Sequence, residues 1–127
     1  MTGYVDNIEQ KTEGNTYFRE VLFTGQHTQL VVMCLQVGEE IGMEVHPTVD
    51  QFFRIESGEG KVVMNGEEAV FSSGFGIVVP AGTQHNVINT GAQPLKLYTL
   101  YSPPNHPEGT VHQTKADAMA AEAAHQG

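Results

Sequence analysis

Residues 74 to 89 read GFGIVVPAGTQHNVIN, and this stretch indicates the fold more sharply than any other part of the chain. Its apolar residues form two short runs, at residues 77–80 and 84–88, which we interpret as β-strands. Residues 80–83 combine proline, alanine, glycine and threonine, the composition of a tight turn. We therefore expect the turn to deliver His85 onto the second strand.

The preceding polar stretch, GMEVHPTVDQFFRIESGEG at residues 42–60, supplies more candidate ligands. Glu44 and His46 are two positions apart on a predicted strand, so their side chains share one face of it. Residues 47–50 form a predicted turn, and Gln51 begins the next strand. We expect this antiparallel neighbour to bring Gln51 back beside His46.

The rest of the chain repeats the same pattern of short strands and turns. Asn65 and Gly66 can both adopt positive φ, so the segment KVVMNGEEAVF predicts a hairpin with a two-residue type I′ turn. Because no helices separate the predicted strands, the pattern favours a β-sandwich or barrel spanning about residues 17–101. The predicted strands cover residues 17–24, 29–37, 41–46, 51–55, 61–64, 67–71, 77–80, 84–88 and 95–101.

The C-terminal part differs in composition. Residues 102–113 contain three prolines, which lack amide donors, so we expect irregular structure there. Residues 115–125 are rich in alanine and follow Thr114, a suitable N-cap, which predicts a short helix. We assign no metal site to His106 and His112, because no predicted strand holds their spacing.

Composition limits the partners and the compartment. The 127 residues suffice for one domain with a core, and the formal net charge of −9 would repel nucleic acid and anionic membrane surfaces. Cys34 is the lone cysteine, which excludes an internal disulfide and favours a reducing compartment; we interpret it as a small buried hydrophobe. No apolar run approaches the roughly 20 residues of a membrane span, and the polar N-terminus does not resemble a signal peptide. We expect a cytoplasmic protein.

The candidate ligands are two imidazoles, one carboxylate and one amide oxygen, from His46, His85, Glu44 and Gln51. Such mixed nitrogen and oxygen ligation suits Zn, Fe(II), Mn, Ni or Cu better than Ca or Mg. We predict one divalent ion bound by these four side chains.

These stretches resemble the two sequence motifs of the cupin superfamily. The second stretch matches the second motif position by position, and the first has the spacing of the first motif, with His46 at its second histidine. The resemblance implies a small all-β, double-stranded β-helix jelly-roll barrel. On this resemblance, residues 1–127 form one domain, with a C-terminal loop and helix after the barrel. The matching residues of the second motif are Gly74, Pro80, Gly82, His85 and Asn89.

Two positions depart from the usual cupin ligand set. Glu44 replaces the first metal-binding histidine, and Gln51 replaces the glutamate. The formal ligand charge remains −1, while the added carboxylate makes the site harder and lowers its preference for copper or nickel. Glu44 could alternatively remain off the metal and serve as a general base.

Three functions follow from such a site. In the first, a small sugar or keto-acid chelates the metal and Glu44 moves a proton, as in an isomerase or lyase, and short cupins of this kind are often labelled mannose-6-phosphate isomerase-like. A phosphorylated sugar is disfavoured because no cluster of lysine and arginine is evident. The alternatives are a non-haem metal dioxygenase and a non-catalytic module that binds a small ligand. A homodimer is expected, since cupins commonly pair through sheet edges.

Overall fold

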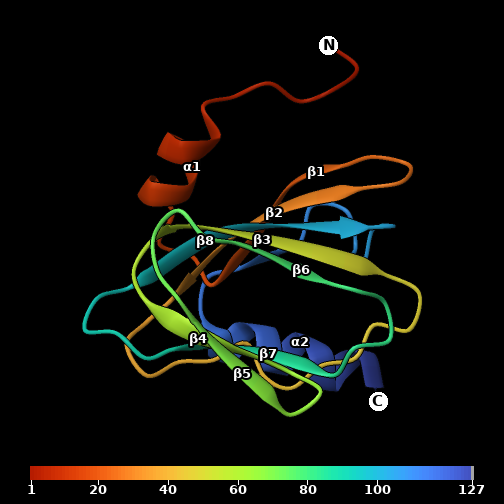
Figure 1. Ribbon diagram of the computed structural model, residues 1–127. Helices are drawn as coiled ribbons and strands as arrows, with labels where there is room; N and C mark the ends of the chain where they lie inside the picture. The colour runs from red at the N-terminus through yellow and green to blue at the C-terminus, as the bar shows by residue number, and fades with distance from the viewer. Residues whose placement is uncertain (127) are drawn as a thin grey trace.

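The computed structural model describes residues 1–126 and consists mainly of two facing β-sheets (Figure 1). Two helices, α1 (Ile8–Gly14) and α2 (Lys115–Gln126), flank the strands. The strands are β1 (Arg19–Thr24), β2 (Gln29–Leu35), β3 (Asp50–Ser57), β4 (Gly60–Met64), β5 (Glu67–Phe71), β6 (Gly76–Val79), β7 (His85–Asn89), β8 (Leu95–Ser102) and β9 (Val111–His112).

Both sheets are antiparallel throughout their paired strands. The larger sheet has the order β6-β3-β8-β2-β1-β9, and the smaller has the order β5-β4-β7. The two sheets enclose the core between their inner faces. This arrangement confirms the predicted all-β jelly roll with a short C-terminal helix.

The core follows from alternation along the strands. On β8, Leu95 and Leu97 are fully buried while the intervening Lys96 is half-buried, because successive side chains point to opposite faces. Leu97 lies opposite Met33 of β2 and Ile55 of β3, which are also fully buried. One end of the enclosed space is therefore filled by aliphatic side chains.

The predicted hairpin between β4 and β5 is confirmed. Asn65 has φ 49° and Gly66 has φ 85°, both positive as a type I′ turn requires. Glycine is required at Gly60 for a different reason. A side chain there would collide with the Ile88 carbonyl oxygen and the Phe71 ring.

Residues 41–46 were predicted as a regular strand, and that prediction is wrong. The segment makes one isolated bridge, which joins Glu44 to His85. Gly42 has φ 111°, which interrupts the extended backbone and prevents a continuous ladder.

The segment at residues 102–113 was predicted to be irregular throughout, and this is also wrong. Val111 and His112 form β9, which pairs with Glu20 and Arg19 of β1. A two-residue strand leaves no periodic pattern in the sequence, so the tertiary pairing creates it.

The helices give one confirmed prediction and one element that was not foreseen. Thr114 Oγ1 accepts a hydrogen bond from the Asp117 amide and caps α2, as predicted. The short α1 had not been predicted; Asn7 Oδ1 caps it by accepting from the Gln10 amide. Within residues 1–126, neither helix has the length and apolar character that a membrane crossing needs.

Candidate metal centre

His85 stands at the start of β7, where the turn after β6 delivers it into the space between the sheets. Gly82 has φ 81° in this turn, and its amide donates to the His46 carbonyl, which joins the two polar stretches. The ring is 4% exposed, and its Nδ1 donates to the Thr83 carbonyl at 2.9 Å. Because a carbonyl can only accept, Nδ1 carries a hydrogen, and in the neutral ring the Nε2 lone pair is available inside the barrel.

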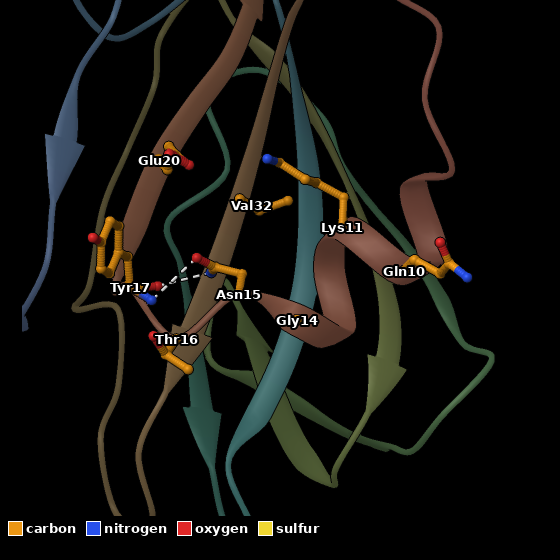
Figure 2. A pocket seen from close by; sticks show the side chains of 8 residues that line it. All are labelled: Gln10, Lys11, Gly14, Asn15, Thr16, Tyr17, Glu20 and Val32. Carbon is orange, nitrogen blue, oxygen red and sulfur yellow. Dashed lines mark hydrogen bonds between the residues drawn. The ribbon is translucent and has the colours of Figure 1, made fainter.

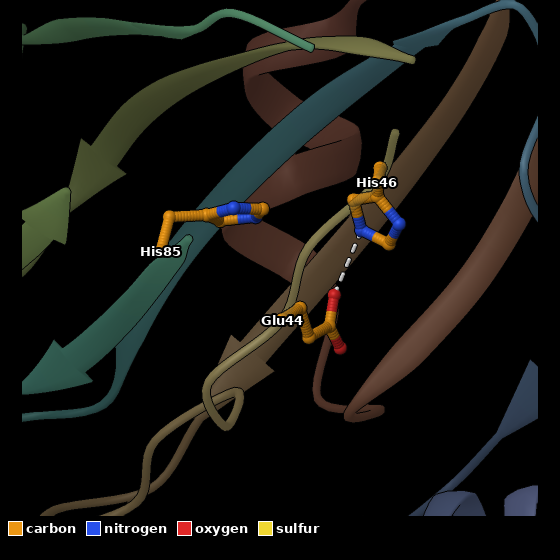
Figure 3. A group of neighbouring side chains, drawn as sticks. All are labelled: Glu44, His46 and His85. Atoms are coloured by element: carbon orange, nitrogen blue, oxygen red, sulfur yellow. Dashed lines mark hydrogen bonds and ion pairs between the residues drawn. The ribbon is translucent and has the colours of Figure 1, made fainter. Parts of the chain in front are cut away.

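Glu44 lies directly beside His85. The backbone amide of each residue donates to the carbonyl of the other, at 2.8 and 2.9 Å. Glu44 and His46 present their side chains to the same side, as predicted, and Glu44 Oε2 lies 2.9 Å from His46 Nε2. Figure 3 shows this contact and the ring of His85 directed toward the pair.

Gln51 reaches the same space from the opposite sheet. The expectation that it lies on the antiparallel neighbour of the His46 segment is wrong, because β3 pairs with β6 and β8. The side chain is 3% exposed, and its Oε1 lies 3.2 Å from His85 Nε2. Its Nε2 donates to Thr99 Oγ1 at 3.0 Å, which fixes the orientation of the amide.

The structure thus brings all four predicted site residues to one region between the two sheets. The ligand atoms of Glu44, His46 and His85 all lie within 4.8 Å of one another. The 2.9 Å and 3.2 Å separations are close to the spacing of about 3 Å between adjacent ligands with bonds of about 2.1 Å.

The chemistry of the donors also fits a cation. In the neutral ring, with its hydrogen on Nδ1, His85 Nε2 is a hydrogen-bond acceptor, and it faces the acceptor Gln51 Oε1 at 3.2 Å. Two facing lone pairs repel unless a positive species lies between them. A divalent ion held by Glu44, His46, Gln51 and His85 would satisfy both.

Positive charge surrounds the Glu44 carboxylate. Burial disfavours its ionised form, but the hydrogen bond from His46 and the charges of His46, Arg19 and His85 together outweigh the effect of burial. Together they hold the pKa of the Glu44 carboxyl below its ordinary value.

Several polar residues around the site were not identified from the sequence. Tyr101 is 1% exposed, its ring lies edge-on to His46 with centroids 5.9 Å apart, and its hydroxyl lies 3.2 Å from His106 Nε2. Burial raises the pKa of the Tyr101 hydroxyl, against the opposing charge of Arg19 and side-chain hydrogen bonds from Gln51 and Arg19. Strand alternation could have identified Thr99 and Tyr101 from the sequence, because they are alternate residues of β8 and point to the same face as Leu97.

A surface hollow lies outside the barrel and does not touch the candidate metal centre. Figure 2 shows it beside α1, with Lys11, Asn15 and Glu20 among its lining residues. Asn15 and Tyr17 hydrogen-bond to each other across its floor. None of the four candidate ligands lines this hollow.

Fold and site together define a small β-barrel protein with a histidine and carboxylate cluster in its interior. The family model of the cupin domain matches residues 31–101 of the sequence. The chain belongs to the cupin family.

The relatives extend the similarity beyond that segment. The uncharacterized protein YrkC of Bacillus subtilis is 56% identical over 126 residues, which cover 94% of this chain and 67% of that protein. The uncharacterized protein L612 of Acanthamoeba polyphaga mimivirus is 43% identical over 85% of this chain and 70% of its own length.

A solved structure shows the same fold at high similarity. The crystal structure of BH2720 from Bacillus halodurans aligns with a TM-score of 0.90 and 52% identity, covering 92% of this chain and 93% of that one.

Proposed function

We propose that this cupin binds one divalent metal ion through Glu44, His46, Gln51 and His85 and acts as an isomerase or lyase on a small sugar or keto-acid. The observation that carries the proposal is the convergence of these donors from two sheets, with His85 Nε2 and Gln51 Oε1 facing each other as acceptors. When bound, the metal would supply a Lewis acid that polarises a carbonyl or enolate oxygen.

The residues of the chain would supply the base and orient the metal ligands. Glu44 has two carboxylate oxygens, so one can hold the cation while the other accepts a proton from the substrate. Thr99 holds the Gln51 amide in place, and Thr83 holds the His85 ring. Such hydrogen bonds orient ligands and strengthen metal binding.

Metal content tests the binding part of the proposal. Elemental analysis of protein purified without added metal should find about one equivalent of Zn, Fe, Mn or Ni. The variant His46→Ala should lose most of it, whereas His27→Ala, which alters an exposed turn histidine, should retain it. Equal metal content in all three proteins would refute the site.

Proton transfer tests the catalytic part. With a keto-acid such as pyruvate in deuterated water, NMR should show faster exchange of the protons next to the carbonyl in the presence of the loaded protein. Glu44→Gln should abolish this acceleration if the carboxylate is the base, and metal content measured in parallel shows whether it is also a required ligand. Exchange at the wild-type rate in Glu44→Gln would exclude Glu44 as the base.

A second candidate function, a metal dioxygenase, is favoured by the composition of the cluster. Two histidines and one carboxylate make the set used by non-haem iron oxygenases. Oxygen uptake by the iron-loaded protein in the presence of substrate would support this reading, while redox-inert zinc in the purified protein would weaken it. Ligand binding without turnover by either route would identify a non-catalytic binding module.

We also propose that the chain forms a homodimer through a sheet edge. β5 and β6 are edge strands of the two sheets, and Val70, Phe75 and Val78 in this region are exposed. Edge strands left uncovered tend to pair. Light scattering coupled to size-exclusion chromatography should give twice the 13.8 kDa chain mass; the monomer mass would refute the dimer.

A further inference from the structure

Arg19 is a buried cation that the proposed function does not use. It is the first residue of β1 and pairs with Met33 of β2 and His112 of β9. Its inward direction follows the alternation that also buries Val21, and it is 1% exposed. Burying a guanidinium is unfavourable unless its charge is paired, as for any buried ion.

The partners of Arg19 do not neutralise its charge. Nη1 lies 3.2 Å from His112 Nδ1, and the guanidinium lies over the Phe18 ring, 5.2 Å from its centroid. Among residues 1–126, Nε has no hydrogen-bond partner, and no carboxylate forms an ion pair with Arg19. Donor capacity and charge are therefore both left unmatched.

Arg19 borders a small cavity next to the metal centre. The cavity is about 110 Å³ in volume and lies between the barrel and α2, with Arg19, His106, His112 and Glu122 in its lining. Tyr101 borders both the cavity and the proposed metal centre, since its hydroxyl contacts His106 and its ring lies edge-on to His46. The cavity and the proposed ligands thus share one neighbouring side chain.

We infer that Arg19 binds the carboxylate group of a small ligand that also reaches the metal centre, so that keto-acids rather than neutral sugars are its substrate class. This inference rests on the proposed function. A divalent ion together with Arg19 exceeds the negative charges of Glu44 and Glu122 by one, which a single carboxylate would balance. A guanidinium binds a carboxylate through paired N–H donors.

The other basic residues favour a carboxylate over a phosphate. Arg54 is paired with Glu56, Lys61 with Glu68, and Lys96 donates to the Glu13 carbonyl. None of these side chains lines the cavity; among the described residues, Arg19 is the one permanent cation in its lining and Glu122 the one carboxylate. A dianionic phosphate is usually held by several donors, whereas one guanidinium suits one carboxylate.

The test uses the two arginines of the chain, Arg19 and Arg54. Selective ¹⁵N-arginine labelling gives two Nε–H signals, and the Arg54→Gln variant assigns them. Pyruvate and 2-oxoglutarate are titrated into zinc-loaded wild-type protein, with hydroxyacetone as the neutral probe and inorganic phosphate as the competing anion. The Arg19 signal should move with either keto-acid and stay in place with hydroxyacetone, while the Arg54 signal stays in place throughout.

Affinity in the variants gives a second readout. In calorimetry, Arg19→Gln should weaken keto-acid binding about tenfold to a hundredfold with the zinc content retained, as expected for a lost hydrogen bond to a charged group. Arg19→Lys keeps the charge without the paired donors and should recover part of the affinity. Arg54→Gln should bind as the wild type does.

Three outcomes would overturn the inference. They are keto-acid binding that leaves the Arg19 signal unmoved, absence of binding by both keto-acids, and a larger response to phosphate than to either keto-acid. Failure of the proposed function is separate, because it appears as absent zinc. A keto-acid response of Arg19 in zinc-free protein would then still support the anion site.

Discussion

Two buried glutamines lie on either side of Tyr101, and they differ in how their amides are satisfied. Gln29 of β2 and Gln51 of β3 both pair with Tyr101 of β8. The Gln29 amide donates to Thr24 Oγ1 and the His106 carbonyl, and its oxygen accepts from two backbone amides. The Gln51 amide donates to Thr99 and also lies against the Tyr101 hydroxyl, and its oxygen faces His85 Nε2.

The difference separates a structural residue from a binding residue. A buried amide with all its partners inside the protein stabilises the fold and leaves nothing for a ligand. A buried amide oxygen directed at another acceptor contributes little to stability, and it is positioned to bind a cation. Identical residue types at matching positions of neighbouring strands thus have different roles.

The largest effect on stability is expected from a change at Gln29, the structural residue of the pair. Gln29→Leu leaves the buried donors and acceptors around residues 105 and 106 without partners. We expect the free energy of unfolding to fall by about 2–4 kcal/mol, measured by urea denaturation, while zinc affinity of the folded protein is retained. A loss of zinc affinity without loss of stability would reverse the roles of the two glutamines.

Gln51→Leu should have the opposite pattern. The substitution removes one proposed ligand, so zinc affinity should fall at least about tenfold in a chelator competition assay. Stability of the zinc-free protein should change by no more than about 1 kcal/mol, because one hydrogen bond is lost and apolar volume is retained. Unchanged zinc affinity would remove Gln51 from the ligand set.

Thr99→Val tests how the Gln51 amide is oriented, and it should lower zinc affinity less than Gln51→Leu does. Valine keeps the shape of threonine but removes the acceptor that orients the Gln51 amide. We expect zinc affinity to fall by up to about tenfold, less than in Gln51→Leu. The control is Val32→Thr on the outer face of β2, which should leave zinc affinity unchanged. A loss in Thr99→Val as large as that in Gln51→Leu would mean that Thr99 does more than position the amide.

A further prediction concerns pH and the backbone region held by Gln29. Burial lowers the pKa of the His106 ring to about 3, assisted by the charge of Arg19 and of the histidines at positions 112 and 46, against the opposing charge of Glu44. In the unfolded chain the ring has its ordinary pKa of about 6.5. Between these values the unfolded state binds a proton that the folded state does not, so the free energy of unfolding falls as pH is lowered through this window.

His106→Gln should reduce that slope. The variant removes the titrating group, and denaturation of zinc-free protein at several pH values between 6.5 and 4 should show a weaker dependence than in the wild type. His27→Gln, at an exposed position, should leave the slope unchanged. A slope that is identical in His106→Gln and the wild type would show that the pKa of His106 is not lowered in the folded protein.

The sequence by itself determined the local features of this protein. Short alternating strands, the Asn65–Gly66 turn and the capped C-terminal helix follow from side-chain period and turn chemistry, which act within a few residues. The cupin motif spacing placed Glu44, His46, Gln51 and His85 in one proposed site, because each residue keeps a fixed position relative to a turn or strand start.

The tertiary structure determined the long-range features, which depend on which strands pair with one another. It placed Gln51 opposite His85 from the other sheet, created β9 beside β1, and interrupted the segment before His46 at Gly42. It also buried Arg19 beside Tyr101, which no local pattern in the sequence had indicated. The physical reason is that pairing and burial are properties of distant segments brought together, so a residue's partners are fixed only when the sheets close.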